Sequence, residues 1–143
     1  MCALPKEVFL SFSSLDVGFA GELVAILRRH GIPVWYSSTD LIGAQQWHDK
    51  IGEALRRCDW FLIVLSPNSL QSHWVKRELY FALNESRYVG RIVPLLLQRC
   101  DYPLFSWTLP GMQLIDFVKD LETGYVELLR IWGIGYRPPT PNV

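Results

Sequence analysis

Hydrophobic and polar positions follow two patterns that alternate along the chain. Short continuous apolar runs predict buried strands, and stretches with an apolar residue every three or four positions predict helices. The predicted strands are 7–12, 32–36, 60–65, 91–98 and 112–117. The predicted helices follow the first three strands and the last one, over about 16–30, 47–58, 72–88 and 117–132.

Residues at the ends of these elements fit the predicted boundaries. Asp16 is placed to cap the first helix, and Gly31 can adopt the left-handed conformation that ends it. Pro94 falls inside the fourth strand, where it removes a hydrogen-bond donor from the sheet. We therefore expect Pro94 at a bulge or on a side of its strand without a neighbour.

Regular alternation of strands and helices predicts an α/β fold with an open parallel sheet and helices on both faces. Five strands suit the flavodoxin-like three-layer fold with strand order 2-1-3-4-5. The length of 143 residues suggests a single domain over 1–143, with a core of about 6–132. We expect the Pro-rich tail, 133–143, to be non-helical and loose.

Such sheets bind ligands beyond the carboxyl ends of the strands where the strand order reverses, here between the first and third strands. The chain leaves those strands through "SFSSLD" and "SPNSLQSHW", both rich in small hydroxyl side chains. Trp74 and Glu78, spaced i and i+4 on the helix after the third strand, would project from one side of it. They could flank the crevice, or Trp74 could simply pack while Glu78 faces water.

Composition narrows the classes of partner. The 14 basic and 14 acidic residues balance, which favours neither nucleic acid nor an anionic membrane, and no apolar run is long enough to span a bilayer. The cysteines, Cys2, Cys58 and Cys100, are odd in number and widely spaced, which fits free thiols in a cytoplasmic protein. No cysteines and histidines have metal-ligand spacing, so we expect no metal.

Common catalytic motifs are missing from the sequence. There is no phosphate-binding loop ending in Lys-Ser/Thr, no G-x-G-x-x-G after the first strand, and no G-x-S-x-G elbow. A phosphorylated receiver domain would need an Asp at the end of the third strand, where this chain has Ser66.

Taken together, several stretches resemble the Toll/interleukin-1 receptor (TIR) domain family, and its bacterial NAD⁺-cleaving members in particular. Residues 8–16, "VFLSFSSLD", resemble box 1, and residues 40–55, "DLIGAQQWHDKIGEAL", resemble box 2. Residues 58–79, "CDWFLIVLSPNSLQSHWVKREL", resemble the third strand and the W-x-x-x-E helix after it. The resemblance covers about residues 6–132 and implies the flavodoxin-like fold inferred above.

The resemblance also implies an activity and a site. Glu78, the acid of W-x-x-x-E, would be the catalytic residue of an NAD⁺ nucleosidase (NADase) that needs no cofactor. It would release nicotinamide and either ADP-ribose or a cyclic isomer. The residues expected to contact NAD⁺ are Phe12, Ser13, Ser14, Trp47 and Trp74.

The loop 37–46 has a second expected role. By resemblance, TIR domains associate with one another through this loop, and assembly activates the enzymes among them in bacterial defence or signalling. The tip residues expected to take part are Asp40, Leu41, Ile42 and Gly43.

Two other functions stay open. In a non-catalytic scaffold the domain would only recruit other TIR domains. This is consistent with box 1, where Phe12 stands in place of the usual Tyr and Ser13-Ser14 supply no cation for a pyrophosphate. A flavodoxin-like domain that binds another small molecule is the remaining alternative.

Overall fold

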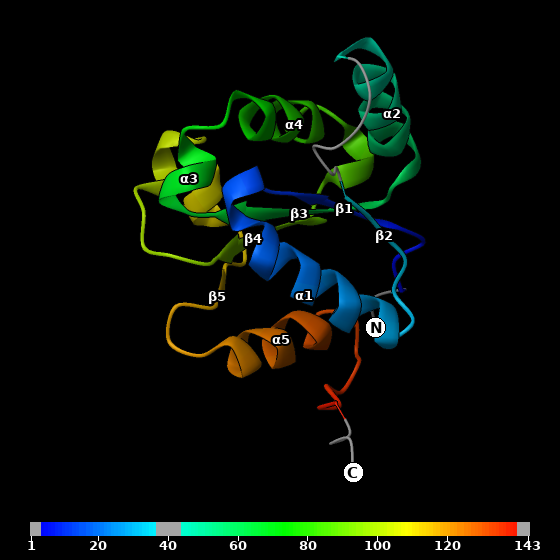
Figure 1. Cartoon of the computed structure of the whole chain (residues 1–143), viewed down its shortest axis with the longest axis vertical. Helices are drawn as coiled ribbons and strands as arrows, with labels where there is room; N and C mark the ends of the chain where they lie inside the picture. The colour runs from blue at the N-terminus through cyan, green and yellow to red at the C-terminus, as the bar shows by residue number, and fades with distance from the viewer. Residues whose placement is uncertain (1–3, 37–43, 140–143) are drawn as a thin grey trace.

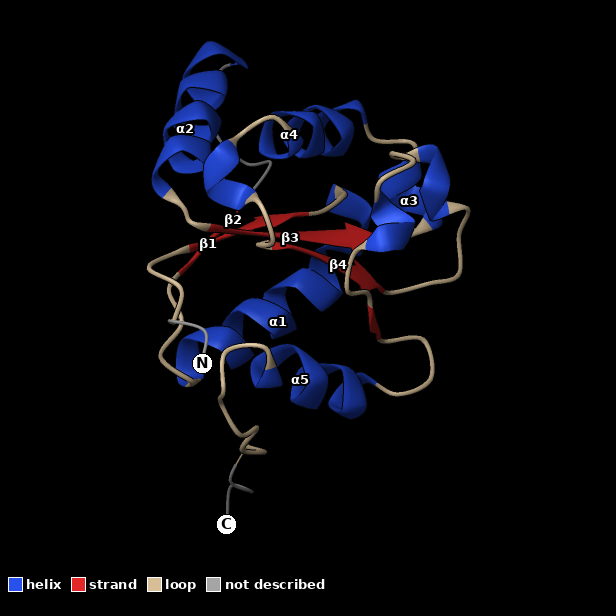
Figure 2. Ribbon diagram, turned by 180° about the vertical axis from the view of Figure 1, so that it is seen from behind, coloured by secondary structure: helices blue, strands red, loops and turns tan. Residues whose placement is uncertain are grey.

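The chain folds as a parallel sheet between two layers of helices (Figures 1 and 2). The computed structural model describes residues 4–36 and 44–139, and for 44–48 it describes the backbone alone. The sheet has five strands in the order β2-β1-β3-β4-β5, and every neighbouring pair is parallel. This confirms the predicted fold class and strand order. The strands are β1 (Val8–Ser11), β2 (Val34–Tyr36), β3 (Trp60–Leu65), β4 (Ile92–Leu96) and β5 (Ile115–Asp116).

Helices cover both faces of the sheet. In Figure 1, α1 and α5 lie on one face, and α2 and α4 lie on the other. A short helix, α3, follows directly after β3. The α-helices are α1 (Val17–Arg29), α2 (Ala44–Arg57), α3 (Pro67–Leu70), α4 (His73–Leu83) and α5 (Leu121–Arg130). Single 3₁₀ turns are η1 (Ser14–Asp16), η2 (Ser86–Tyr88), η3 (Tyr102–Leu104) and η4 (Leu109–Gly111).

The two helical layers enclose separate cores, because successive side chains of a strand point to opposite faces of the sheet. On β1, Val8 and Leu10 join the core beside α1 and α5, whereas Phe9 joins the core beside α2 and α4. All six residues of β3 are buried, as expected of a central strand covered on both sides.

The helix predicted over 72–88 is shorter than expected. α4 ends at Leu83, and the buried Tyr88 belongs to the separate turn η2. The helical spacing of apolar residues extends to Tyr88 because Tyr88 packs into the same core as α4, although its backbone is no longer α-helical. The prediction also missed α3, whose start is fixed by reciprocal hydrogen bonds between Ser66 and Ser69.

Two of the expected boundary features are confirmed and one is wrong. Gly31 has φ +81° and ends α1. Pro94 pairs with Ile63 without a bulge, and the first β4–β5 pair is Leu95 with Ile115. The N–H of Leu97 bonds to β3, and successive residues of a strand form hydrogen bonds on opposite sides. Position 94 therefore faces the β5 side, where a proline removes no hydrogen bond to β3. Asp16 makes no capping bond to α1, because its carboxylate serves another contact described below.

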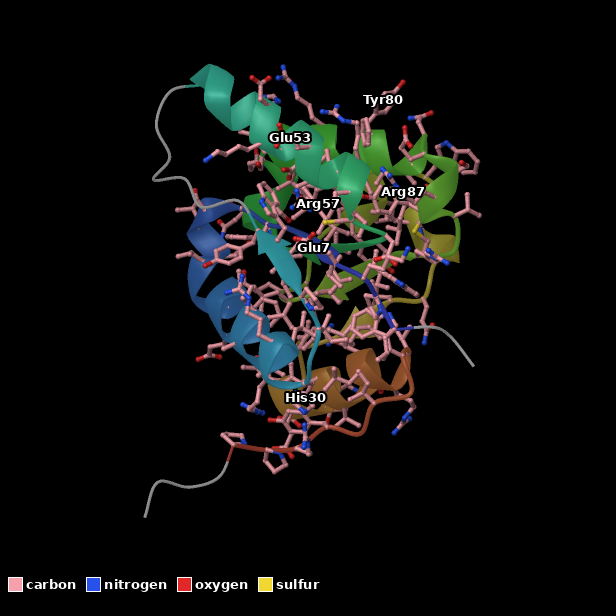
Figure 3. The ribbon with its side chains drawn as sticks, turned by 90° about the vertical axis from the view of Figure 1, so that its right-hand side faces the viewer. Glu7, His30, Glu53, Arg57, Tyr80 and Arg87 are labelled. Carbon is pink, nitrogen blue, oxygen red and sulfur yellow. The ribbon has the colours of Figure 1, made fainter. Side chains whose placement is uncertain are left out.

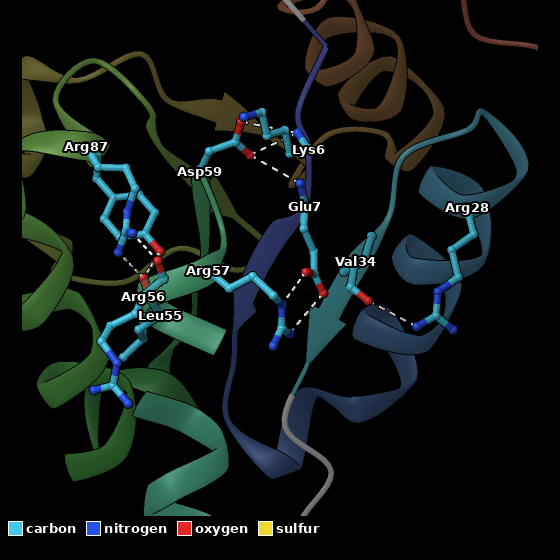
Figure 4. Close-up of polar contacts among 10 residues, drawn as sticks. Lys6, Glu7, Arg28, Val34, Leu55, Arg56, Arg57, Asp59 and Arg87 are labelled. Atoms are coloured by element: carbon cyan, nitrogen blue, oxygen red, sulfur yellow. Dashed lines mark hydrogen bonds and ion pairs between the residues drawn. The ribbon is translucent and has the colours of Figure 1, made fainter. Parts of the chain in front are cut away.

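Polar contacts hold α2 against the amino ends of β1 and β3 (Figure 4). The Asp59 carboxylate accepts hydrogen bonds from the backbone N–H groups of Lys6 and Glu7. The Arg57 guanidinium pairs with the Glu7 carboxylate at 2.6 Å. At the end of α2, Arg87 donates to the carbonyls of Leu55 and Arg56, which a helix terminus leaves unpaired.

The segment after α5 is non-helical as predicted, but it is packed against α1 as far as Arg137. The buried His30 accepts a hydrogen bond at Nε2 from the Arg137 N–H, at 3.0 Å. The Arg29 guanidinium donates to the Arg137 carbonyl at 2.7 Å, and the ring of Tyr136 stacks on that of His30. Among the described residues, no helix has the length and apolar character needed to cross a bilayer.

Candidate functional site

The predicted acid, Glu78, is buried beneath α4 and points at the sheet. Ser72 starts the helix by accepting a hydrogen bond from the Val75 N–H. From that start, Val75, Glu78 and Leu79 fall on the buried face of the helix. Glu78 is only 4% exposed, although a carboxylate is one of the groups least often found inside a protein. Its place in the core therefore calls for a specific partner.

That partner is Ser11, the last residue of β1. Its hydroxyl donates a hydrogen bond of 2.8 Å to Oε1 of Glu78, and both residues are buried. Burial raises the pKa of Glu78 to about 7, while the hydrogen bond from Ser11 lowers it by favouring the ionised form. The result is a carboxyl group that changes charge near neutral pH at the carboxyl end of β1.

A second buried carboxylate, that of Asp16, links the segments that follow β1 and β3. Asp16 accepts hydrogen bonds from the Ser66 hydroxyl at 2.5 Å and from the Asn68 side-chain amide at 2.9 Å. Asp16 follows β1, and Ser66 follows β3, so this contact spans the point where the strand order reverses. Because each oxygen of Asp16 accepts a hydrogen bond from a neutral donor, Asp16 links η1 to α3.

The other residues predicted around the site lie in different parts of the molecule. Phe12 is buried in the core beside α1, 6.3 Å from the ring of Tyr36, which is the opposite face from Glu78. Ser13 is buried and caps η1, and Ser14 is exposed. Trp74 is 39% exposed on the first turn of α4, with the Arg77 guanidinium 5.7 Å from its ring centre.

The remaining candidates lie outside the part of the chain that is described. This holds for Asp40, Leu41, Ile42 and Gly43, and for the side chain of Trp47. The backbone at Trp47 belongs to the first turns of α2. The rest of the apolar face predicted for this helix is confirmed, since Ile51, Leu55 and Cys58 are buried.

Sequence reasoning missed Ser11 as a member of the site and the role of Asp16 in it. A signal for Ser11 was present, because it is a hydroxyl residue within the apolar run "EVFLSF". A buried hydroxyl needs a hydrogen-bond partner, and a nearby carboxylate is the strongest one available. The sequence held no comparable signal that Asp16 would contact Ser66 and Asn68.

The arrangement suits electrostatic stabilisation by one carboxylate. An ionised Glu78 in a low-dielectric interior acts on a nearby positive charge more strongly than a carboxylate in water would. No group of three potential metal ligands is found among the described histidines, cysteines and acids. Of the described cysteines, Cys58 is buried, and burial raises the pKa of its thiol to about 12, which disfavours the nucleophilic thiolate.

Comparison with known proteins gives a consistent result. The family model described as "TIR domain" matches residues 8–129. A curated relative is the NAD(+) hydrolase TcpC of Escherichia coli O6:H1 (strain CFT073), 29% identical over 83 residues, which are 57% of this chain and 27% of TcpC. Another is human Toll-like receptor 6, 28% identical over 98 residues, 66% of this chain and 12% of the receptor. The chain thus matches less than a third of the length of each.

Solved structures agree on the fold. The TIR domain of the Toll-related receptor TRR-2 from Hydra magnipapillata superposes with a TM-score of 0.70 at 21% identity. The match covers 87% of this chain and 94% of that domain. With the family model spanning both box 1 and the W-x-x-x-E helix, this chain belongs to the TIR domain family.

Proposed function

We propose that this TIR domain cleaves the bond between nicotinamide and ribose in NAD⁺, with Glu78 as its catalytic residue. The observation that carries the proposal is the buried Glu78 carboxyl, held by Ser11 at the end of β1. Similarity to the NAD(+) hydrolase TcpC supports the choice of substrate. Burying a carboxyl costs stability, and residues with a strongly perturbed pKa gather at functional sites.

The chemistry of the substrate explains why one carboxylate is enough. Departure of nicotinamide leaves an oxocarbenium-like cation on the ribose, as in glycoside hydrolysis. The nicotinamide is a pyridinium before the bond breaks and leaves as a neutral molecule, so it needs no general acid. The negative charge of Glu78 stabilises the cation more as the bond breaks, and such differential stabilisation raises the rate.

Ser11 acts as a positioning residue in this scheme. Its hydroxyl occupies one lone pair of Oε1 and keeps the carboxylate at the end of β1. It also favours the ionised form that the reaction requires. The Asp16–Ser66 contact would fix the loops that leave β1 and β3 around the same crevice.

The expected products are nicotinamide and either ADP-ribose, when water captures the cation, or a cyclic isomer, when the substrate captures it internally. We expect Phe12, Ser13, Ser14, Trp47 and Trp74 to complete the NAD⁺ pocket as the family resemblance implies. We further propose that self-association with other TIR domains activates the enzyme, within a cytoplasmic bacterial defence or signalling system.

A non-catalytic scaffold is the second candidate. Similarity to Toll-like receptor 6 favours it, as does the lack of a basic side chain at Ser13 and Ser14. In that case Glu78 would position α4 against β1 through its contact with Ser11 rather than stabilise a cation.

Nicotinamide release decides between the two functions. Concentrated protein is incubated with NAD⁺, with and without a crowding agent, and nicotinamide is followed by chromatography. We expect release by the wild type and at least a hundredfold slower release by Glu78→Gln, which preserves size and the hydrogen bond from Ser11.

The matched control is Glu127→Gln, which removes a carboxylate from the exposed face of α5. It should leave nicotinamide release within about twofold of the wild type. A wild type that is inert in every assembly condition, while it still binds other TIR domains, would favour the scaffold.

A further inference from the structure

A cavity beside α4 carries positive charge that the proposed reaction does not use. Its volume is about 430 Å³, and it lies between α4 and the segment that joins η3 to η4. Its polar lining includes His73, Lys76 and Arg77, and no carboxylate contributes to it. Within the described residues, neither Lys76 nor Arg77 forms an ion pair with an acid.

The floor of the cavity is apolar. Leu79 is buried there, and Leu83 and Phe105 are half-buried. Tyr80 stands at the rim and is 72% exposed. Figure 3 shows it on the outer side of the helical layer, far from His30 at the opposite side of the molecule. An apolar floor that includes the ring of Phe105, below a cationic rim, fits a planar ring that carries an anion.

The cationic rim is partly preorganised. The guanidinium of Arg77 lies 5.7 Å from the ring centre of Trp74, a contact that restricts its orientation. Lys76 is its neighbour in the chain, and His73 is the first residue of α4, where the helix dipole is positive. An arginine and a lysine that line the same cavity suit phosphate, which the guanidinium can bind through two parallel hydrogen bonds.

This cavity is separate from the buried contact between Glu78 and Ser11, since neither residue lines it. Glu78 points from α4 toward Ser11 of β1, whereas the cavity opens on the side of α4 that faces Phe105. We propose that the cavity binds a mononucleotide, with its base on Leu79, Leu83 and Phe105 and its phosphate against Lys76 and Arg77. Binding here requires no cleavage of NAD⁺, so the proposal stands or falls independently of the reaction proposed above.

Titration of ¹⁵N-labelled protein with AMP tests the site directly. We expect saturable shifts of the Leu83 and Phe105 amide resonances, with smaller or no shifts at Ser11. Adenosine and inorganic phosphate, each lacking one half of the ligand, should bind at least tenfold more weakly than AMP. Shifts centred on Ser11 would place AMP beside Glu78 and overturn the proposal.

Paired variants separate this site from general charge attraction. The double variant Lys76→Ala/Arg77→Ala should weaken AMP binding at least tenfold, whereas Arg130→Ala, which removes an exposed cation from α5, should not. Phe105→Ala should also weaken binding, unlike Trp107→Ala, because Trp107 is 87% exposed and outside the cavity lining. Equal weakening by both members of a pair, or phosphate binding as tightly as AMP, would refute the site.

Discussion

Glu78 combines a charge that the proposed reaction needs with a location that opposes that charge. Burial favours the neutral acid, the Ser11 hydroxyl favours the carboxylate, and the balance raises the pKa of Glu78 to about 7. The protonation state of this one residue should therefore control both activity and stability, in opposite directions.

Activity should rise with pH. Because the ionised carboxylate stabilises the ribosyl cation, nicotinamide release at pH 6 should be about tenfold below its value at pH 8, with a midpoint near 7. Ser11→Ala removes the bond that lowers the pKa of Glu78, so its midpoint should move to higher pH. Initial rates from pH 5 to 9 measure both effects.

Two variants serve as controls for the pH profile. Ser11→Thr keeps a hydroxyl and should restore the wild-type midpoint, and Ser86→Ala removes an exposed hydroxyl from η2 and should not move it. A midpoint common to wild type and Ser11→Ala would remove Ser11 from its positioning role.

Stability should change the opposite way with pH. The unfolded chain ionises Glu78 near its ordinary pKa of 4.5, and the folded chain does so only near 7. The contribution of Glu78 to the free energy of unfolding is therefore greatest below pH 4.5, falls between pH 4.5 and 7, and changes no further above that range. The total loss from this residue is on the order of 3 kcal/mol.

Urea unfolding of wild type and Glu78→Gln across pH 4 to 8 measures that loss. Glutamine has no charge to desolvate, so the variant should gain stability relative to the wild type as the pH rises. A constant difference between the two proteins across this range would contradict the raised pKa.

At the scale of elements, α5 is packed so closely against Phe117, the residue after β5, that the contact requires a glycine at position 124. A Cβ added at Gly124 would lie 2.2 Å from Cδ1 of Phe117. Gly124→Ala should therefore lower the free energy of unfolding by about 1–3 kcal/mol through overpacking. In a Phe117→Leu background the same substitution should be milder, and urea unfolding of the four proteins measures the coupling.

Gly21 provides the matched comparison. It lies within α1, and an added Cβ there has no atom within 4 Å. Gly21→Ala should raise the free energy of unfolding by about 1 kcal/mol, because alanine has the higher helix propensity. Destabilisation at both glycines would indicate a general intolerance of alanine rather than the contact with Phe117.

Particular elements show what the sequence could and could not predict. β3 was predicted with its observed bounds because six buried positions leave an unbroken apolar run. The end of α4 was wrong because periodicity records burial, and Tyr88 is buried from a turn outside the helix. Glu78 was identified through its motif, but the role of Ser11 emerged only from the packing of α4 against β1.

For the whole molecule, the proposed self-association predicts that activity depends on protein concentration. Nicotinamide release per molecule should increase as the protein is concentrated, in step with the assembled fraction measured by sedimentation. Glu127→Gln should follow the same curve as the wild type. A rate per molecule that stays constant on dilution to monomer would exclude activation by assembly.

The contact between α1 and the last described segment assigns a tautomer to His30. The Ile26 carbonyl, 2.7 Å from Nδ1, can only accept, so the ring proton is on Nδ1. Nε2 then has the lone pair that the Arg137 N–H requires. In this tautomer the ring donates to α1 and accepts from the last described segment, so a single side chain joins the two through one matched donor and one matched acceptor.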